Sequence, residues 1–254
     1  MNIGLVLSGG GMRGVAHIGV IKALEERGIF PSHISGTSAG AIVGAFYAAG
    51  IGWEKMLDFF RTIPIFHREK YARKKPGFID TEKFYNDFKE LLPDDDFKAL
   101  QKPLFITGTD VLNGTLKYFF EGPLIMPILA SASFPGVFTP TKIEGSFYVD
   151  GGVLNNFPIE PLTPLCDKII GVYVNPLKHI KFEDLKHSYN VVERSYKIKM
   201  AAESIAKFKD CDLVIRPREL NNYATFYAHD IDTIFEIGYT KAVEALQQNA
   251  SLFP

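Results

Sequence analysis

The chain has 254 residues, 46% hydrophobic and 22% charged, which is ordinary for a globular protein with a substantial core. Its formal net charge of −1 argues against a general nucleic-acid-binding protein. Cys166 and Cys211 stand in no metal-binding pattern and fit a reducing, cytoplasmic location, and we expect neither a secretory signal nor a transmembrane segment.

Strand and helix signals alternate from the start of the chain. Residues 2–8 predict a buried parallel strand, 14–27 a helix, 33–36 a short second strand and 39–50 a helix of small residues. This order predicts an α/β fold with a mainly parallel central sheet between helices. Further strands are expected at 104–111, 116–122, 147–152, 169–174 and 211–217, and helices near 53–60, 81–91, 190–207 and 230–248. With no internal repeat and no low-complexity linker, residues 1–254 are expected to form a single domain.

The first strand leads into the glycine-rich sequence LSGGGMRG. Gly9, Gly11 and Gly14 satisfy G-x-G-x-x-G, a spacing that binds a dinucleotide pyrophosphate, a phosphate or another anion at a helix N-terminus. A dinucleotide site also needs an acidic residue about 20 positions later. No Asp or Glu lies between Arg27 and Gly50, so the loop favours a different anion.

Residues 36–40, GTSAG, match G-x-S-x-G, in which a serine on a sharp strand-to-helix turn exposes its hydroxyl. Gly36 and Gly40 leave the room that this turn needs. Small residues also form ordinary turns, so the pentapeptide alone leaves a structural role open. Because this pentapeptide follows the glycine loop along the chain, we interpret Ser38 as a nucleophile.

A nucleophilic serine gives the glycine loop a function as an oxyanion hole. Backbone N–H groups near Gly10, Gly11 and Met12 would face the negative oxygen of a tetrahedral intermediate, and such a donor contributes about 3 kcal/mol in the transition state. Arg13 adds positive potential or orients the loop, or it is a surface arginine.

A serine hydroxyl also needs a base. None of the six histidines lies in a recognisable motif, and we expect His17 and His33 to be structural or surface residues. The sequence YVDGGVLNNFP instead places Asp150 at the end of an apolar strand, before Gly151 and Gly152, which allow close backbone approach. Ligand chemistry gathers at the carboxyl ends of strands in a parallel sheet, which favours Asp150 as the base. The alternative is an Asp-Gly hairpin turn.

The motifs GGGMRG, GTSAG and DGG, in this order, resemble those of the patatin-like phospholipase family. FITGTDVLNG at 105–114 and ASASFPGVFTP at 130–140 agree, so the resemblance covers nearly the whole chain. It implies a three-layer α/β/α fold and a Ser-Asp dyad that uses no histidine, metal or cofactor. Carried over to this chain, Ser38 is the nucleophile, Asp150 is the proton acceptor, and the oxyanion site is formed by Gly10, Gly11, Met12 and Arg13.

An ordinary aspartate is a weak base at neutral pH, because its pKa is near ~3.9. Asp150 would need partial desolvation to raise its proton affinity. Its apolar neighbours Phe147, Tyr148 and Val149 permit this.

An apolar segment, residues 53–66, precedes a basic one, residues 67–75, with five Lys or Arg and one Glu. Such a pair of segments can rest on an anionic bilayer surface, or form a core helix followed by a solvated loop. The acidic run Asp94–Asp96 lacks an EF-hand pattern and predicts a helix cap or a solvated turn rather than a calcium site.

We therefore expect a serine hydrolase of lipid carboxylic esters, with phospholipid or lysophospholipid as substrate and peripheral contact with a membrane surface. Three alternatives share parts of this pattern. One is an acyltransferase that uses Ser38, and another is a Ser-His-Asp hydrolase that uses a histidine such as His229. The third is a non-catalytic protein that binds lipids or nucleotides.

Overall fold

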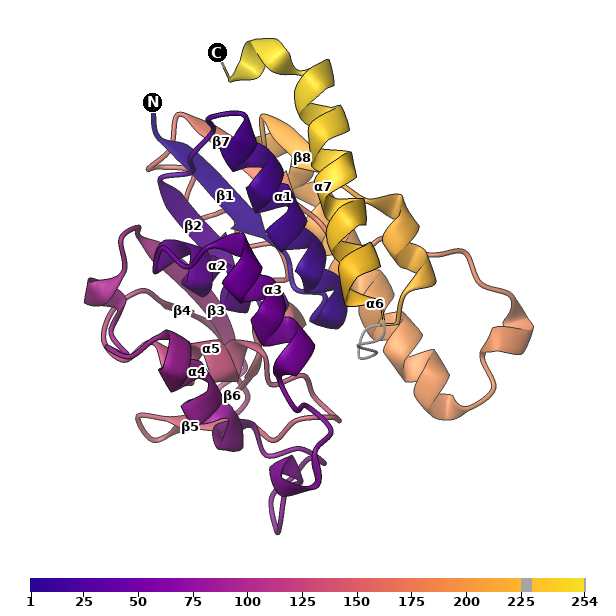
Figure 1. The fold of residues 1–254 in the computed structure, drawn as a ribbon. Helices are drawn as coiled ribbons and strands as arrows, with labels where there is room; N and C mark the ends of the chain where they lie inside the picture. The colour runs from indigo at the N-terminus through magenta and orange to yellow at the C-terminus, as the bar shows by residue number, and fades with distance from the viewer. Residues whose placement is uncertain (225–229, 254) are drawn as a thin grey trace.

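The computed structural model describes residues 1–224 and 230–253, whose strands form one sheet with helices packed on it (Figure 1). The strand order is β5-β6-β3-β2-β1-β7-β8, and β4 also pairs with β3. The strands are β1 (Ile3–Leu7), β2 (His33–Gly36), β3 (Leu104–Asp110), β4 (Thr115–Phe119), β5 (Thr141–Ile143), β6 (Ser146–Asp150), β7 (Lys168–Val172) and β8 (Leu213–Ile215). The helices are α1 (Val15–Glu26), α2 (Ala39–Ala48), α3 (Trp53–Thr62), α4 (Tyr85–Leu91), α5 (Ile125–Ser131), α6 (Ser188–Ala206) and α7 (Ile231–Gln248).

The middle of the sheet is parallel. β1 pairs with β2 on one side and with β7 on the other, β2 continues to β3, and β7 continues to β8. Every residue of β1 is buried, as an apolar strand covered on both faces requires. The structure confirms the mainly parallel α/β sheet predicted from the alternation of strand and helix signals.

Three layers are formed. Helices α1, α2, α3 and α7 lie over one face of the sheet, and Leu5 and Leu7 of β1 belong to the core on that side (Figure 1). Val6 belongs to a second apolar cluster on the opposite face. That face is covered by the segment 157–166 and by Phe208, which follows α6.

Strand β3 brings two strand ends together. Its first half pairs with β2, where Gly36 lies opposite Ile106, and its second half pairs with β6, where Asp150 lies opposite Gly108. Because β4 occupies the other edge of β3 along 106–110, β2 and β6 share one edge. The carboxyl ends of β2 and β6 therefore point toward each other.

Sequence patterns predict neither α5 nor β5. The seven residues of α5 are too few to display helical periodicity, and Pro127 sits in its first turn, where the missing N–H costs no helical hydrogen bond. β5 forms a hairpin with β6, whose turn is Glu144–Gly145, with φ of 46° and 88°. The hairpin interpretation of Asp150–Gly151 is therefore wrong, because the turn lies before β6 rather than after it.

Helix α3 directs its apolar side chains inward, including Met56 and Phe60, so the core interpretation is right for this part of 53–66. Phe66 and most of 67–75 are exposed. Within residues 1–224 and 230–253, no helix is both long and apolar enough to cross a bilayer.

Candidate active site

Ser38 sits at the turn between β2 and α2, with φ 55° and ψ −124°. This backbone conformation is strained for any residue with a side chain, and such strain is typical of functional sites. The flanking glycines are required by packing. A Cβ at Gly36 would lie 2.4 Å from the carbonyl oxygen of Gly40, and a Cβ at Gly40 would lie 2.2 Å from that of Leu7.

Hydrogen bonds hold the Ser38 turn in place. The backbone N–H of Ser38 donates to Oγ of Ser131 at 2.8 Å. The hydroxyl of Thr37 donates to the carbonyl oxygen of Asn155 at 2.9 Å and lies 2.6 Å from the hydroxyl of Thr107. The turn is thus tied to β3, to α5 and to the loop that follows Asp150.

Asp150 ends β6 and faces this turn, because β2 and β6 meet along β3. Its carboxylate accepts a hydrogen bond from the N–H of Gly152 at 2.7 Å. The Ser38 side chain interacts with the same carboxylate and lowers its pKa. A Cβ at Gly151 would lie 2.2 Å from Oγ1 of Thr107, so this glycine allows the chain to turn beside β3.

Burial raises the pKa of Asp150 to about 6, against the lowering effect of the hydrogen bonds from Ser38 and Gly152. The carboxyl is 3% exposed, and desolvation disfavours its charged form. Asp150 therefore holds a proton more tightly than a free aspartate while remaining largely ionised at neutral pH.

The glycine loop between β1 and α1 packs against the Ser38 turn. A Cβ at Gly9 would lie 3.2 Å from Cβ of Ser38, and one at Gly14 would lie 2.4 Å from Cβ of Ala39. The loop is fixed by a 2.6 Å hydrogen bond from Nδ2 of Asn175 to the carbonyl oxygen of Gly9.

Residues 11–14 form a 3-10 turn that leads directly into α1, and Gly11 has φ 58°, in the left-handed region that favours glycine. Gly10, Gly11, Met12 and Arg13 all line the same pocket as Ser38 and Asp150. A helix start of this kind presents backbone N–H groups and positive potential to an anion.

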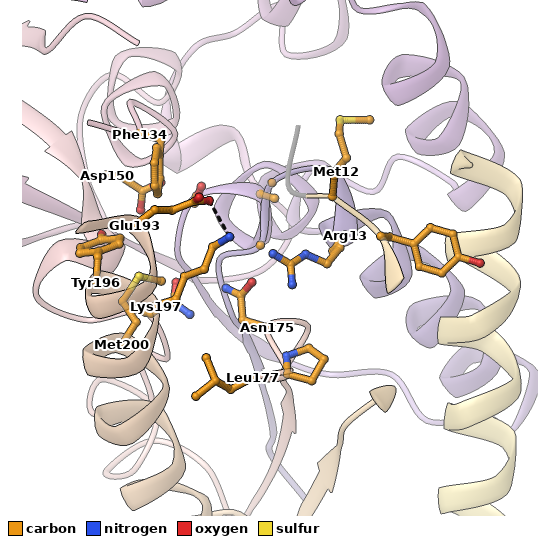
Figure 2. Close-up of a pocket in the computed structure, with 18 of the residues that line it drawn as sticks. Met12, Arg13, Phe134, Asp150, Asn175, Leu177, Glu193, Tyr196, Lys197 and Met200 are labelled. Atoms are coloured by element: carbon orange, nitrogen blue, oxygen red, sulfur yellow. Dashed lines mark hydrogen bonds and ion pairs between the residues drawn. The ribbon is translucent and has the colours of Figure 1, made fainter. Parts of the chain in front are cut away.

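Arg13 is not a surface residue: it is 7% exposed and lines the pocket. Burial lowers its pKa, while the nearby Tyr173 and Glu193 raise it. Figure 2 shows its side chain extending toward Asn175 on the side of the pocket opposite Asp150. The structure therefore favours its orienting or electrostatic role.

The pocket has a volume of about 560 Å³ and is lined by both apolar and charged side chains. Its apolar lining residues include Ile42, Phe60, Ile65, Ala132, Phe134 and Phe138. Its polar lining residues include Arg13, Asn175, Lys178, Glu193, Arg194 and Lys197. Lys197 pairs with Glu193 at 2.6 Å on α6 (Figure 2).

Asn156 lines the pocket and is 3% exposed, and its Nδ2 has no hydrogen-bond partner within the described part of the chain. Its Oδ1 lies close to Gly9 and Gly152, since a Cβ at either would fall within 2.9 Å of it. The sequence patterns do not mark Asn156 as a site residue. No motif signals a donor here, because its position depends on how the loop after Asp150 folds back against the glycine loop.

The histidines contribute no base to this pocket in the part of the chain that is described. His17 is fully buried, and its ring lies 2.8 Å from the carbonyl oxygen of Ser8. Burial lowers its pKa to about 4, so it is a neutral structural residue as predicted. His229, the candidate for a Ser-His-Asp arrangement, lies outside the described residues.

The acidic run near α4 has structural partners. Oδ1 of Asp95 accepts hydrogen bonds from the N–H groups of Leu124 and Ile125, and Asp96 caps a 3-10 turn by accepting from the N–H of Lys98. These contacts agree with the predicted cap. No group of three or more His, Cys, Asp or Glu with metal-binding geometry occurs among the residues described.

A serine elbow, a buried carboxylate and a glycine loop at a helix start thus converge at one pocket of a three-layer α/β protein. The chain belongs to the patatin-like phospholipase family, whose model matches residues 5–163.

Two curated relatives illustrate the similarity. An NTE family protein of Mycobacterium tuberculosis is 35% identical over 179 residues, which is 68% of this chain and 49% of that protein. Lysophospholipase NTE1 of Meyerozyma guilliermondii is 28% identical over 284 residues, covering 95% of this chain and 19% of that protein. The chain thus spans about half the length, or less, of these relatives.

Two solved structures share the fold. VipD from Legionella pneumophila gives a TM-score of 0.58 at 17% identity, with 97% of this chain and 67% of that chain covered. Human GIVD cytosolic phospholipase A2, solved in complex with methyl gamma-linolenyl fluorophosphonate, gives a TM-score of 0.53 at 9% identity, with 98% and 57% covered.

Proposed function

We propose that the protein is a serine hydrolase of lipid carboxylic esters, with a phospholipid or lysophospholipid as substrate. The observation that carries this proposal is that Ser38, on its strained turn, and the buried carboxylate of Asp150 line one pocket, where the Ser38 side chain interacts with that carboxylate. Membership of the patatin-like phospholipase family supports the same reaction class.

In the proposed reaction, Oγ of Ser38 attacks the ester carbonyl carbon while its proton passes to Asp150. The tetrahedral intermediate then collapses, and the proton moves from Asp150 to the departing alkoxide, which leaves as an alcohol. The acyl group remains on Ser38. Asp150 next accepts a proton from water, which attacks the acyl-enzyme. When the second tetrahedral intermediate collapses, this proton passes from Asp150 to Oγ of Ser38, and the fatty acid is released.

The negative oxygen of each tetrahedral intermediate needs stabilisation, and the glycine loop offers it. Gly10, Gly11, Met12 and Arg13 line the pocket at the start of α1, where backbone N–H groups are not used by the helix. Such donors act on charge that develops only in the transition state. We therefore assign these residues to the oxyanion site.

The mixed lining of the pocket supports an amphiphilic substrate. Apolar side chains from α2, from α3 and from the segment after α5 suit an acyl chain, while the charged side chains of α6 suit a polar headgroup. The ester bond would then lie at Ser38, which lines the same pocket.

The test is covalent labelling with a fluorophosphonate probe, combined with hydrolysis of a soluble short-chain ester and of lysophosphatidylcholine. We expect Ser38→Ala to abolish labelling and hydrolysis, and we expect no single histidine substitution to do so. Absence of labelling in the unaltered protein would favour a lipid- or nucleotide-binding protein. Loss of hydrolysis on replacing His229 would favour a Ser-His-Asp mechanism, and acyl transfer to added alcohols in preference to water would favour an acyltransferase.

A further inference from the structure

Two exposed segments outside the catalytic residues concentrate positive charge. Residues 66–78 and 176–199 together hold 11 of the 28 Lys and Arg but only 4 of the 29 Asp and Glu. Their formal charge is therefore +7, in a chain whose net charge is −1. The remainder of the chain is therefore net acidic.

Both segments border the mouth of the pocket that holds Ser38. Ile65, which directly precedes the first segment, lines the pocket, and the N–H of Phe78 at its end donates to the carbonyl oxygen of Val137 beside the pocket residue Phe138. The second segment supplies pocket residues from Pro176 onward. In Figure 1 the first segment projects at the bottom of the molecule and the second at its right.

The same segments expose large apolar side chains. Phe78 is 71% exposed and Phe182 is 84% exposed, so neither side chain contributes to the core. Six further side chains in these segments are exposed as well: Phe66, Tyr71, Leu177, Val191, Val192 and Ile198. Aromatic and aliphatic side chains interleaved with Lys and Arg are the composition that binds the interface of an anionic bilayer.

Ion pairs anchor the first segment to the body of the protein. Lys70 pairs with Asp87, and Lys75 pairs with Asp80 and Glu82. These contacts hold the segment in a defined position, while Arg73 and Phe78 stay exposed.

We propose that residues 66–78 and 176–199 form a docking surface that seats the pocket mouth on an anionic lipid bilayer. The exposed rings enter the boundary between headgroups and acyl chains, and the surrounding Lys and Arg contact the anionic headgroups. This proposal rests on the proposed function, because docking in this orientation lets an amphiphile move from the bilayer into the pocket without crossing water.

The experiment is flotation of the full chain with phosphatidylcholine vesicles, with and without phosphatidylglycerol, in a Ser38→Ala background that leaves the lipid intact. We expect binding to the anionic vesicles that weakens at high salt, because exposed charges are screened. Arg73→Gln with Lys186→Gln should lower the affinity about tenfold or more, since each basic residue at such a surface contributes about fivefold. Phe78→Ser with Phe182→Ser should lower it by about tenfold per side chain that inserts.

Matched control residues lie at the opposite end of the parallel strands, in the loops that precede β2 and β8. Arg27→Gln with Lys209→Gln removes two exposed charges there, and Phe30→Ser removes a phenylalanine that is 59% exposed. These variants should bind vesicles as the unaltered chain does. Unchanged binding by the Arg73/Lys186 and Phe78/Phe182 variants, equal losses in the controls, or equal binding to neutral vesicles would overturn the proposal.

Hydrolysis of a soluble short-chain ester, measured with Ser38 intact, separates this proposal from the proposed function. None of the substituted residues lines the pocket, so each variant should keep that activity. Failure of the unaltered protein to hydrolyse any ester would refute the proposed function, whereas intact hydrolysis without selective vesicle binding would refute the docking surface alone.

Discussion

Replacing Asp150 by Asn should stabilise the protein while it abolishes hydrolysis. Burial raises the pKa of Asp150 from 3.8 to about 6, so the folded protein disfavours the ionised carboxyl. The sign follows from linkage: the stability that this group contributes is fully present below its unfolded pKa and is lost as the pH rises through 6. Relative to a carboxyl with an unshifted pKa, buried Asp150 therefore lowers the free energy of unfolding by about 1 kcal/mol at pH 4.5 and about 3 kcal/mol at pH 8.

Asn has nearly the same shape and no charge, and its oxygen can still accept the hydrogen bond from the N–H of Gly152. Urea unfolding of both proteins should therefore give a stability advantage for Asp150→Asn that grows by about 2 kcal/mol between pH 4.5 and pH 8. Ser38→Ala is the control, because it is equally inactive but keeps the buried carboxyl. An advantage that does not change with pH, or a less stable variant at pH 8, would refute the reasoning from burial.

Four further predictions follow from the same site. The kcat/KM for a soluble ester should fall about tenfold between its plateau and pH 5, because Asp150 must be ionised to act as a base; a plateau that continues to pH 4 would contradict this. Ser38→Gly should be about 1 kcal/mol more stable than Ser38→Ala in urea unfolding, because φ 55° strains alanine; equal stabilities would argue against strain. Asn156→Leu should lower kcat about 100-fold with little change in KM if Nδ2 donates to the oxyanion; a change confined to KM would place that donor in ground-state binding. Gly11→Val should depress kcat while Ser38 remains open to a fluorophosphonate probe, and a normal kcat would refute the oxyanion assignment.

The motifs were predictable from sequence because local sterics demand them. Gly36 and Gly40 have backbone atoms within 2.4 Å of where a Cβ would stand, so a sharp turn at Ser38 leaves no choice of residue. Such close backbone contacts require glycine at fixed spacings, and these spacings can be recognised in the sequence. The glycine loop was recognised in the same way, although its spacing did not identify which anion it binds.

The position of Asp150 was predicted correctly at a strand end, but for a reason that does not hold. The sequence pattern predicts Asp150 at the carboxyl end of a strand in a parallel sheet, whereas β6 is antiparallel to β3. Asp150 reaches Ser38 because β6 continues the edge of β3 that β2 leaves free. Such a register depends on pairing between segments some 40 to 70 residues apart, and no local pattern encodes it.

The burial of Arg13 and the inward position of Asn156 were out of reach for the same physical reason. Each side chain is polar and lies beside a recognised motif. Polar residues in such positions occur in solvated loops as well as in pocket linings, so residue type alone does not distinguish the two. What buries them is packing between distant elements, the glycine loop against Asn175 and the loop after Asp150 against Gly9. Helix α6 places the charged side chains of Glu193, Arg194 and Lys197 in the pocket lining, and its sequence contains no motif typical of a catalytic site.

The site concentrates two unfavourable features that the rest of the fold must offset. Ser38 is held in a strained backbone conformation, and Asp150 is held away from water, each at a cost of a few kcal/mol at most. The hydrogen bonds of Ser131, Thr37 and Gly152 supply opposing terms that fix both groups in place. Because strain exposes the hydroxyl and burial strengthens the base, the two costs act on the two partners of one proton transfer. A variant that removed the strain at Ser38 or the burial of Asp150 would be more stable and would react more slowly.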